Sequence, residues 1–513
     1  MYEYGKIYMG LTNPDKEKVY MHLSQSNRHG LIAGASGTGK TITMKVMAES
    51  FSDAGVPVFL CDVKGDVSGL CEPGDDSPGM QKRIDKFDLW ETFTYHSYPV
   101  TFWDIYGKGG IPIRTTVSDM GPEILARILG LTDVQEGVLN IIFRIADEHD
   151  LMLTDLKDLK AVIQYVYDNR AEYSARYGNM APQSLSSIIR VLIPLEDQGG
   201  NDFFGEPMLD IYDWIRTDAK GRGMINILHA VETIKYPKLY AAFMIWMLAE
   251  LFENLPEVGD PEKPTIVFFF DEAHLLFNDA PKSLVQKIEQ TVKLIRSKGV
   301  GIYFVTQSPS DIPDTVLAQC SNRVQHALRA YTPAEQKAVR TAAQTFRTNP
   351  NFKTEDVIME LGTGEALTSF LDEEGIPQIV QKTSIICPES RMGPCDEDTK
   401  ERIMSQSMLS GKYGEAVDNE SAYEVLEKEA EEKAERDEIE RQKAELEAER
   451  QKLEAEKEKA AQKEAARKEK EAEKKRAAEQ KKKERIKSKI ESQVISTGGQ
   501  LFRKTLFGIL KRR

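Results

Sequence analysis

The sequence predicts an α/β fold in which helices cover a parallel sheet and one long charged helix follows. Three stretches support this prediction. A glycine-rich segment, residues 34–41, lies between an apolar run and a helix-like run. A second apolar run, residues 265–270, ends in two carboxylates, and residues 423–490 contain no glycine or proline. Buried parallel strands read as continuous apolar runs, and a segment dominated by Glu, Lys, Ala, Arg and Gln favours a helix.

The first part of the chain, residues 6 to about 23, alternates between apolar and polar residues. The turn sequence Asn13-Pro14-Asp15 divides it. Alternation on both sides of a turn is typical of a β-hairpin. We expect this hairpin to lead into the glycine-rich segment.

The glycine-rich segment Gly34-Ala35-Ser36-Gly37-Thr38-Gly39-Lys40-Thr41 matches G-x-x-x-x-G-K-[ST], the pattern of a phosphate-binding loop. An apolar, strand-like run precedes it and a helix-like run follows it, as this loop requires. Glycines let backbone N–H groups approach a polyphosphate, and the helix N-terminus attracts negative charge. Lys40 is expected to neutralise the β- and γ-phosphates, and the Thr41 hydroxyl to ligate Mg²⁺. The segment is the predicted ATP-binding loop.

A further buried strand is predicted at residues 56–62, and it ends in a polar segment. Ligands of doubly wound sheets lie beyond the carboxyl ends of the strands. We therefore expect Asp62, Lys64 and Asp66 to face the nucleotide.

The pattern changes between residues 69 and 223. Strand-like runs come first, and amphipathic helix patterns follow. The expected strands are residues 93–101 and 111–117, and the expected helices lie near residues 121–129, 134–148, 156–166 and 185–195. We interpret this region as a mainly helical insertion in the core.

The apolar run at residues 265–270 ends in Asp271-Glu272-Ala273-His274. A central parallel strand that ends in two acids can deliver both to a nucleotide site. Asp271 is expected to hold Mg²⁺ through water, and Glu272 to orient and deprotonate the attacking water. The pair therefore predicts hydrolysis rather than binding alone.

The next predicted strand, residues 302–305, is followed by Thr306 and Gln307. A polar side chain at the end of a strand between the two site strands can sense the γ-phosphate, so Gln307 is the predicted sensor. Arg323 and Arg329 lie at the two ends of a further strand. Either could act as an arginine finger in a neighbouring subunit, and a surface ion pair is an equally good interpretation of each.

The C-terminal part begins with a predicted hairpin that completes the sheet, with strands at residues 361–367 and 376–380. The long helix then carries Ile439, Leu446 and Leu453 at heptad spacing, but the companion apolar position is mostly polar. A solitary charged helix and a weak coiled coil both remain open. The basic amphipathic tail after it suits docking to a partner, to a membrane surface or to the protein's own core.

Composition limits the function classes. Lys plus Arg number 68 and Asp plus Glu 82, so the net charge is −14 and any DNA contact must be local. The five cysteines contain no C-x-x-C pair, which favours a reducing cytosol and argues against structural zinc. The N-terminus lacks a secretory pattern, and no apolar run approaches membrane-spanning length. We expect a cytoplasmic protein without an integral membrane segment.

The order of these motifs resembles that of the HerA/FtsK class of P-loop ATPases, and most closely the bacterial HerA-like ATPases of the YjgR type. Residues 27–34 and 255–260 carry the closer resemblance, which covers about residues 1–395. It implies a RecA-like core and a ring, commonly a hexamer, that binds ATP between subunits and pumps DNA or protein. The sequence departs from HerA helicases in one respect, because at most a short hairpin precedes Gly34 where those proteins carry a β-barrel.

By the same resemblance, the nucleotide roles fall to Lys40, Thr41, Asp271, Glu272 and Gln307. The segments expected are the hairpin and P-loop half of the core (1–68), the insertion (69–223), the second half of the core (224–395), the charged helical extension (396–490) and the basic tail (491–513).

The predicted function is Mg²⁺-dependent ATP hydrolysis by a homo-oligomer, coupled to binding or translocation of double-stranded DNA. The alternative is an ATP-switched interaction protein without translocation, in which the insertion or the charged tail binds a protein partner.

Overall fold

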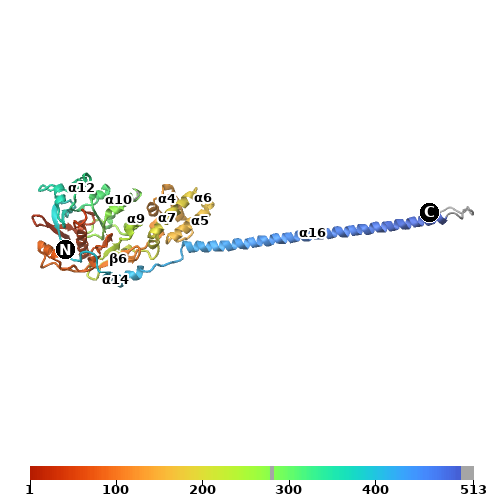
Figure 1. Ribbon diagram of the computed structural model, residues 1–513, viewed down its shortest axis with the longest axis horizontal. Helices are drawn as coiled ribbons and strands as arrows, with labels where there is room; N and C mark the ends of the chain where they lie inside the picture. The colour runs from red at the N-terminus through yellow and green to blue at the C-terminus, as the bar shows by residue number, and fades with distance from the viewer. Residues whose placement is uncertain (278–281, 498–513) are drawn as a thin grey trace, which may run out of the picture. The chain divides into compact units, whose positions relative to one another are not determined.

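The computed structural model describes residues 1–277 and 282–497. Residues Met1–Leu426 form one compact unit, and the chain from Glu427 onward is a second unit that is described by itself. Figure 1 labels the main elements. Of the predicted tail at residues 491–513, only the backbone of residues 491–497 is described, so the expected docking of this tail lies outside the described residues.

One sheet organises the compact unit, and thirteen strands of the described residues form it. Its parallel part has the order β11-β4-β10-β9-β5-β8-β6-β7. An antiparallel part continues from β11 through β12 and β13 to β2, which also pairs with β1 and β3. The parallel strands are β4 (Gly30–Ala33), β5 (Val58–Asp62), β6 (Val100–Asp104), β7 (Ile111–Pro112), β8 (Ile225–His229), β9 (Ile266–Phe270), β10 (Val300–Thr306) and β11 (Asn322–His326). The antiparallel strands are β1 (Tyr2–Glu3), β2 (Lys6–Thr12), β3 (Lys18–His22), β12 (Glu365–Ser369) and β13 (Gln381–Ile385).

Apolar side chains cover both faces of the parallel sheet. In β9, Ile266, Phe268 and Phe270 belong to one buried cluster. The alternate residues Val267 and Phe269 belong to the other. Successive side chains of a strand point to opposite faces, so a strand buried on both sides must be apolar throughout. The run at residues 265–270 is therefore a central strand, as predicted.

Helices connect most of the parallel strands, because two parallel neighbours cannot be joined by a tight turn. The exception is the pair β6 and β7, which the loop at residues 105–110 joins without a helix. The patterns predicted near residues 121–129, 134–148, 156–166 and 185–195 correspond to α3, α4, α5 and α7. The helices are α1 (Lys40–Asp53), α2 (Pro78–Phe87), α3 (Val117–Leu129), α4 (Asp133–Glu148), α5 (Leu156–Asp168), α6 (Arg170–Tyr177), α7 (Pro182–Leu195), α8 (Asn201–Phe203), α9 (Pro237–Asn254), α10 (Lys282–Ile295), α11 (Asp314–Leu317), α12 (Pro333–Gln344), α13 (Thr354–Glu360), α14 (Glu397–Gln406), α15 (Met408–Tyr413) and α16 (Ala422–Thr497).

Several predicted strand boundaries are wrong. The strand expected at residues 93–101 begins only at Val100, directly after Pro99, and the strand expected at residues 111–117 is limited to β7. The second strand of the C-terminal hairpin is β13 and not residues 376–380, which contain Pro377. Proline has no N–H group to donate to a sheet ladder, so apolar runs around it need not pair. The N-terminal hairpin is confirmed as β2 paired with β3.

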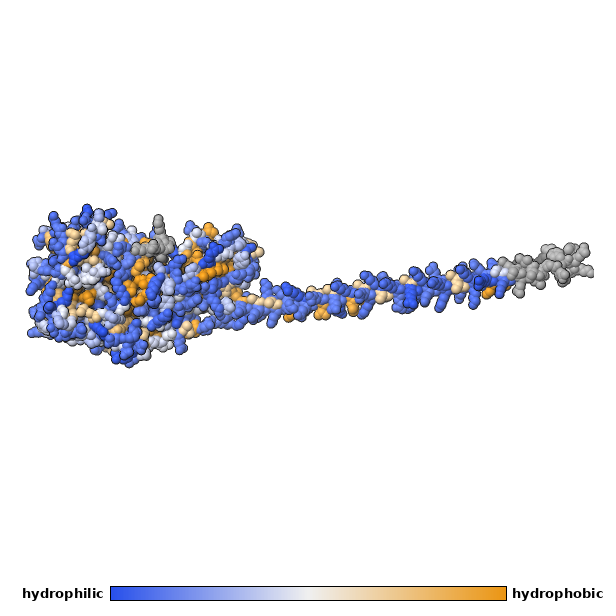
Figure 2. All heavy atoms as spheres, in the orientation of Figure 1, coloured by the Kyte–Doolittle hydropathy of each residue, from blue (hydrophilic) through white to orange (hydrophobic). Residues whose placement is uncertain are grey.

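Helix α16 is 76 residues long, and its residues 427–490 are exposed. Its surface is hydrophilic along most of its length (Figure 2). Ion pairs one turn apart support the helix, among them Glu432 with Arg436 at 3.2 Å and Glu464 with Lys468 at 2.9 Å. The side chain of Leu446 is 63% exposed, and pairing of this helix with a second helix stays a prediction.

The part of the chain that the structure describes contains no helix that is both long and apolar enough to cross a bilayer.

Two buried histidines join the sheet to the elements around it. His29 Nδ1 accepts the N–H of Ile302 at 3.0 Å, and its Nε2 donates to the carbonyl of Val292 at 2.8 Å. His326 donates from Nδ1 to the carbonyl of Glu365 at 3.0 Å, and its Nε2 lies 2.8 Å from the Thr43 hydroxyl, which donates to it. Each ring needs one unprotonated nitrogen for these contacts. Burial lowers the pKa of both histidines to about 4.

These histidines predict a loss of stability in acid. An unfolded histidine takes up a proton below about pH 6.5, whereas the folded rings resist protonation until about pH 4. Each should therefore lower the free energy of unfolding by about 2 kcal/mol between pH 7 and pH 5. Urea denaturation of the wild type and of His326→Gln at pH 7 and pH 5 measures the part of this change in the free energy of unfolding that His326 contributes.

The comparison between wild type and variant is needed because buried Glu49 acts in the opposite direction. Burial raises the pKa of Glu49 to about 7, so the contribution of Glu49 to the free energy of unfolding grows as the pH falls. A wild type and a His326→Gln variant with the same pH dependence would contradict the assignment.

Candidate nucleotide site

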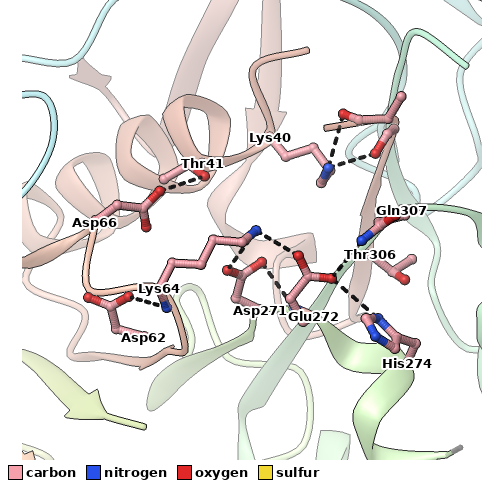
Figure 3. Close-up of polar contacts among 12 residues, drawn as sticks. Lys40, Thr41, Asp62, Lys64, Asp66, Asp271, Glu272, His274, Thr306 and Gln307 are labelled. Atoms are coloured by element: carbon pink, nitrogen blue, oxygen red, sulfur yellow. Dashed lines mark hydrogen bonds and ion pairs between the residues drawn. The ribbon is translucent and has the colours of Figure 1, made fainter. Parts of the chain in front are cut away.

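The glycine-rich loop joins β4 to α1, and α1 begins at Lys40 (Figure 3). The Lys40 Nζ atom donates to the carbonyls of Gly34 at 2.6 Å and Ala35 at 3.1 Å. Gly37 and Gly39 have φ of +73° and +115°, which side chains with a Cβ rarely adopt. The loop thus wraps around the end of the Lys40 side chain, in the arrangement that the sequence predicts for a phosphate-binding loop.

A buried histidine supports this loop from the neighbouring strand. A Cβ atom added at Gly34 would lie 2.5 Å from the Cβ of His326, so only glycine fits there. The hydroxyl of Thr43, in the first turn of α1, bonds to the same histidine. His326 therefore fixes the loop and the start of α1 against β11. The sequence contains no local signal for this role, because Thr43 and His326 are far apart along the chain.

The paired carboxylates follow β9, two strands away from β4. Glu272 has φ of +48°, a left-handed conformation that costs a residue other than glycine about 1–2 kcal/mol. Its N–H donates to Asp271 Oδ1 at 2.9 Å. Residues held in such conformations cluster at functional sites. In Figure 3 the Glu272 carboxylate lies beside that of Asp271, and Lys64, Gln307 and His274 surround it.

Three side chains hold the Glu272 carboxylate. Lys64 Nζ lies 2.6 Å from Oε1, and on Oε2 the Gln307 amide donates from 3.4 Å and His274 Nδ1 lies at 3.3 Å. Gln307 follows β10, which lies between β4 and β9 as the sequence predicts for a sensor. The role of sensor remains a prediction, but its contact with Glu272 gives it a physical basis.

The loop after β5 faces the site, as expected from its place at the carboxyl end of a parallel strand. Lys64 also lies 3.8 Å from Asp271 Oδ2, and the Thr41 hydroxyl donates to Asp66 Oδ2 at 3.5 Å. Among the described residues, Asp66 Oδ1 is buried without a hydrogen-bond partner. Hard oxygen atoms from Thr41, Asp66 and Asp271 are the donors that Mg²⁺ prefers, so the residues present fit this ion.

The charges of the site shift its pKa values in a consistent pattern. Burial, opposed by Lys64, raises the pKa of Asp271 to about 6. Burial also acts to raise the pKa of Glu272, but the hydrogen bond and the charge of Lys64 outweigh it and the pKa falls. Burial and then the charge of Lys64 lower the pKa of Lys40. Lys64 is thus close enough to influence both the P-loop lysine and the carboxylates.

Of the two predicted arginines, Arg323 lies within β11 and Arg329 lies beyond its end, so the strand is shorter than expected. Both bond to backbone carbonyls of their own chain. The Arg323 guanidinium, which is half-buried, donates to the carbonyls of Cys320, Leu317 and Thr345. The Arg329 guanidinium donates to Met359 and Leu361. Neither contact involves Lys40, Asp271 or Glu272. Action of either arginine in a neighbouring subunit stays a prediction.

A loop of this kind before α1, with paired carboxylates at the end of a central parallel strand, defines a RecA-like P-loop NTPase core. The chain belongs to the helicase HerA-like C-terminal family, whose sequence profile matches residues 8–513. This match confirms the resemblance to the HerA class.

Individual relatives are more distant. The chain is 20% identical over 372 residues to the DNA double-strand break repair helicase HerA of Sulfolobus acidocaldarius, covering 71% of this chain and 66% of that protein. It is 30% identical over 127 residues to a probable helicase of Methanocaldococcus jannaschii, covering 23% and 22% of the two chains. The chain thus spans less than two thirds of the length of either relative.

A solved structure shares the fold. The plasmid coupling protein TrwB, in complex with a non-hydrolysable ATP analogue, has a TM-score of 0.50 and 13% sequence identity. The alignment covers 76% of this chain and 96% of TrwB. At this identity the likeness concerns the fold, and it supports the RecA-like α/β core.

Proposed function

We propose that this protein is a Mg²⁺-dependent ATPase. One observation carries the proposal: Lys40 in the P-loop and the Asp271–Glu272 pair lie at the carboxyl ends of β4 and β9, and Gln307, directly after the strand between them, contacts Glu272. TrwB, which shares the fold, was solved with a non-hydrolysable ATP analogue.

Each residue has a role that its position supports. The P-loop N–H groups and Lys40 would bind the β- and γ-phosphates, and Thr41 and Asp271, with Asp66 beside them, would hold Mg²⁺. When bound, Mg²⁺ neutralises charge on these phosphates. Glu272 would accept a proton from water as the water oxygen bonds to the γ-phosphorus and the bond to the β–γ bridging oxygen breaks. Gln307 would orient Glu272 relative to the γ-phosphate.

We further propose that hydrolysis is coupled to double-stranded DNA in a homo-oligomer, with a hexameric ring as the expected form. The Sulfolobus relative is named a DNA double-strand break repair helicase, which supports a DNA substrate. The net charge of −14 supports the alternative, an ATPase that switches binding of a protein partner without translocation.

Two substitutions test the chemistry. Lys40→Ala removes the cation from the P-loop and should abolish ATP binding, as measured by fluorescence of a labelled nucleotide. Glu272→Gln keeps the shape but not the base, so it should bind ATP and hydrolyse it about 10³-fold more slowly. Lys108→Gln, in the loop after β6, serves as the control. Turnover at the wild-type rate in both site variants would contradict the roles assigned to Lys40 and Glu272.

DNA tests the coupling. If ATP hydrolysis is coupled to movement along DNA, double-stranded DNA should raise the ATPase rate by about tenfold or more. Light scattering in the presence of ATP should give the mass of an oligomer. An unstimulated rate together with a monomeric mass would favour the protein-switch alternative.

A further inference from the structure

Lys64 is a charged residue of the site that the P-loop chemistry above leaves without a role. Its ammonium group bonds to Glu272 Oε1 at 2.6 Å and lies 3.8 Å from Asp271 Oδ2 (Figure 3). The inference below rests on the proposed ATPase function and adds a residue to it.

The loop that carries Lys64 is fixed at its base. Asp62, the last residue of β5, accepts the N–H groups of Lys64 at 3.2 Å, Gly65 at 2.7 Å and Val67 at 3.3 Å. Gly65 has φ of +79°, which allows the tight turn. The side chain of Lys64 is nevertheless 44% exposed. A fixed backbone with a partly exposed side chain lets the ammonium group change partners without movement of the loop.

The bond to Lys64 restrains the residue that must act as the base. A carboxylate takes a proton from water through an oxygen lone pair that points at the water, so contacts that fix its oxygens also fix where it can act. Lys64 occupies Oε1, while Gln307 and His274 contact Oε2. Glu272 is thus engaged on both oxygens in this structure. The contact to Lys64 is the shortest of the three, so its release frees Oε1 to turn toward a water molecule and accept its proton.

Stability alone is a weak reason for this ion pair. An ion pair with one partner this exposed contributes little to folding because solvent screens it. The Lys64 ammonium group lies instead on both carboxylates, on the side where Figure 3 draws Lys40, and the γ-phosphate of a bound triphosphate would enter there. A phosphate competes well for an ammonium group, because it offers several charged oxygens.

We propose that Lys64 contacts the γ-phosphate and holds Glu272 until a nucleoside triphosphate binds. The γ-phosphate takes the Lys64 ammonium group from Glu272, and Oε1 is then free to act on water. A nucleoside diphosphate lacks this phosphate, so it leaves the Lys64–Glu272 bond in place. Lys64 therefore links the presence of the third phosphate to the release of the base.

A double-mutant cycle of binding tests the proposal without relying on turnover. The probes are Mg²⁺ with adenylyl imidodiphosphate and Mg²⁺ with ADP, and the variants of the full chain are Glu272→Gln, Lys64→Gln and both together. Glu272→Gln removes the competitor for Lys64, so the triphosphate analogue should bind about tenfold more tightly. In the Lys64→Gln background the same change should alter its affinity by less than about twofold.

ADP affinity should stay within about twofold of wild type in all variants. Lys64→Arg, which keeps the charge, should retain the preference for the analogue over ADP. The control is Lys108→Gln. Lys108 lies in the loop after β6, and Asp104 accepts three backbone N–H groups there, as Asp62 does in the loop of Lys64. This control should leave both affinities unchanged.

Two results would overturn the proposal. Equal tightening by Glu272→Gln in both backgrounds would mean that Glu272 merely repels the phosphate. Equal loss of analogue and ADP affinity in Lys64→Gln would mean that Lys64 supports the fold of the site. Either result leaves the ATPase assignment standing, whereas that assignment fails separately if Lys40→Ala still binds and hydrolyses ATP.

Discussion

The site depends on the order of four parallel strands, β4-β10-β9-β5. Their carboxyl ends lie side by side, so the loops that follow them must meet at one edge of the sheet. The P-loop, Gln307, the Asp271–Glu272 pair and Lys64 each follow one of these strands. These strands are apolar on both faces and therefore stay buried. The polar side chains of the site are confined to the residues that come directly after them.

Within this arrangement, charge balance decides what each side chain can do. Asp271 and Glu272 bring two acids to a partly buried place, and Lys64 is the cation that lies on both. Lys40 is bonded to carbonyls of its own loop. The two lysines of the site are therefore engaged before a nucleotide enters, and a triphosphate with Mg²⁺ must exchange these internal contacts for its own. The strained backbone of Glu272 is consistent with a carboxylate placed for that exchange.

Much of the site could be predicted from the sequence because its motifs are local. The P-loop spacing, the apolar strand before Asp271 and the strand before Gln307 each lie within about ten residues. The partners of Glu272 could not be predicted in the same way, since Lys64 and Glu272 meet only through the pairing of β5 with β9. The same holds for His326 beneath the P-loop. The strand ends predicted near Pro99 and Pro377 are wrong because an apolar pattern alone does not reveal where a sheet ladder can begin.

The most direct measurement is an experimental structure of the full chain with Mg²⁺ and adenylyl imidodiphosphate. The account predicts that Lys40 leaves the carbonyls of Gly34 and Ala35 for the phosphates, and that the Lys64 ammonium group lies on the γ-phosphate and no longer on Glu272. A nucleotide bound elsewhere would contradict the site itself. A nucleotide bound in the P-loop with the Lys64–Glu272 bond intact would contradict the proposed release of the base.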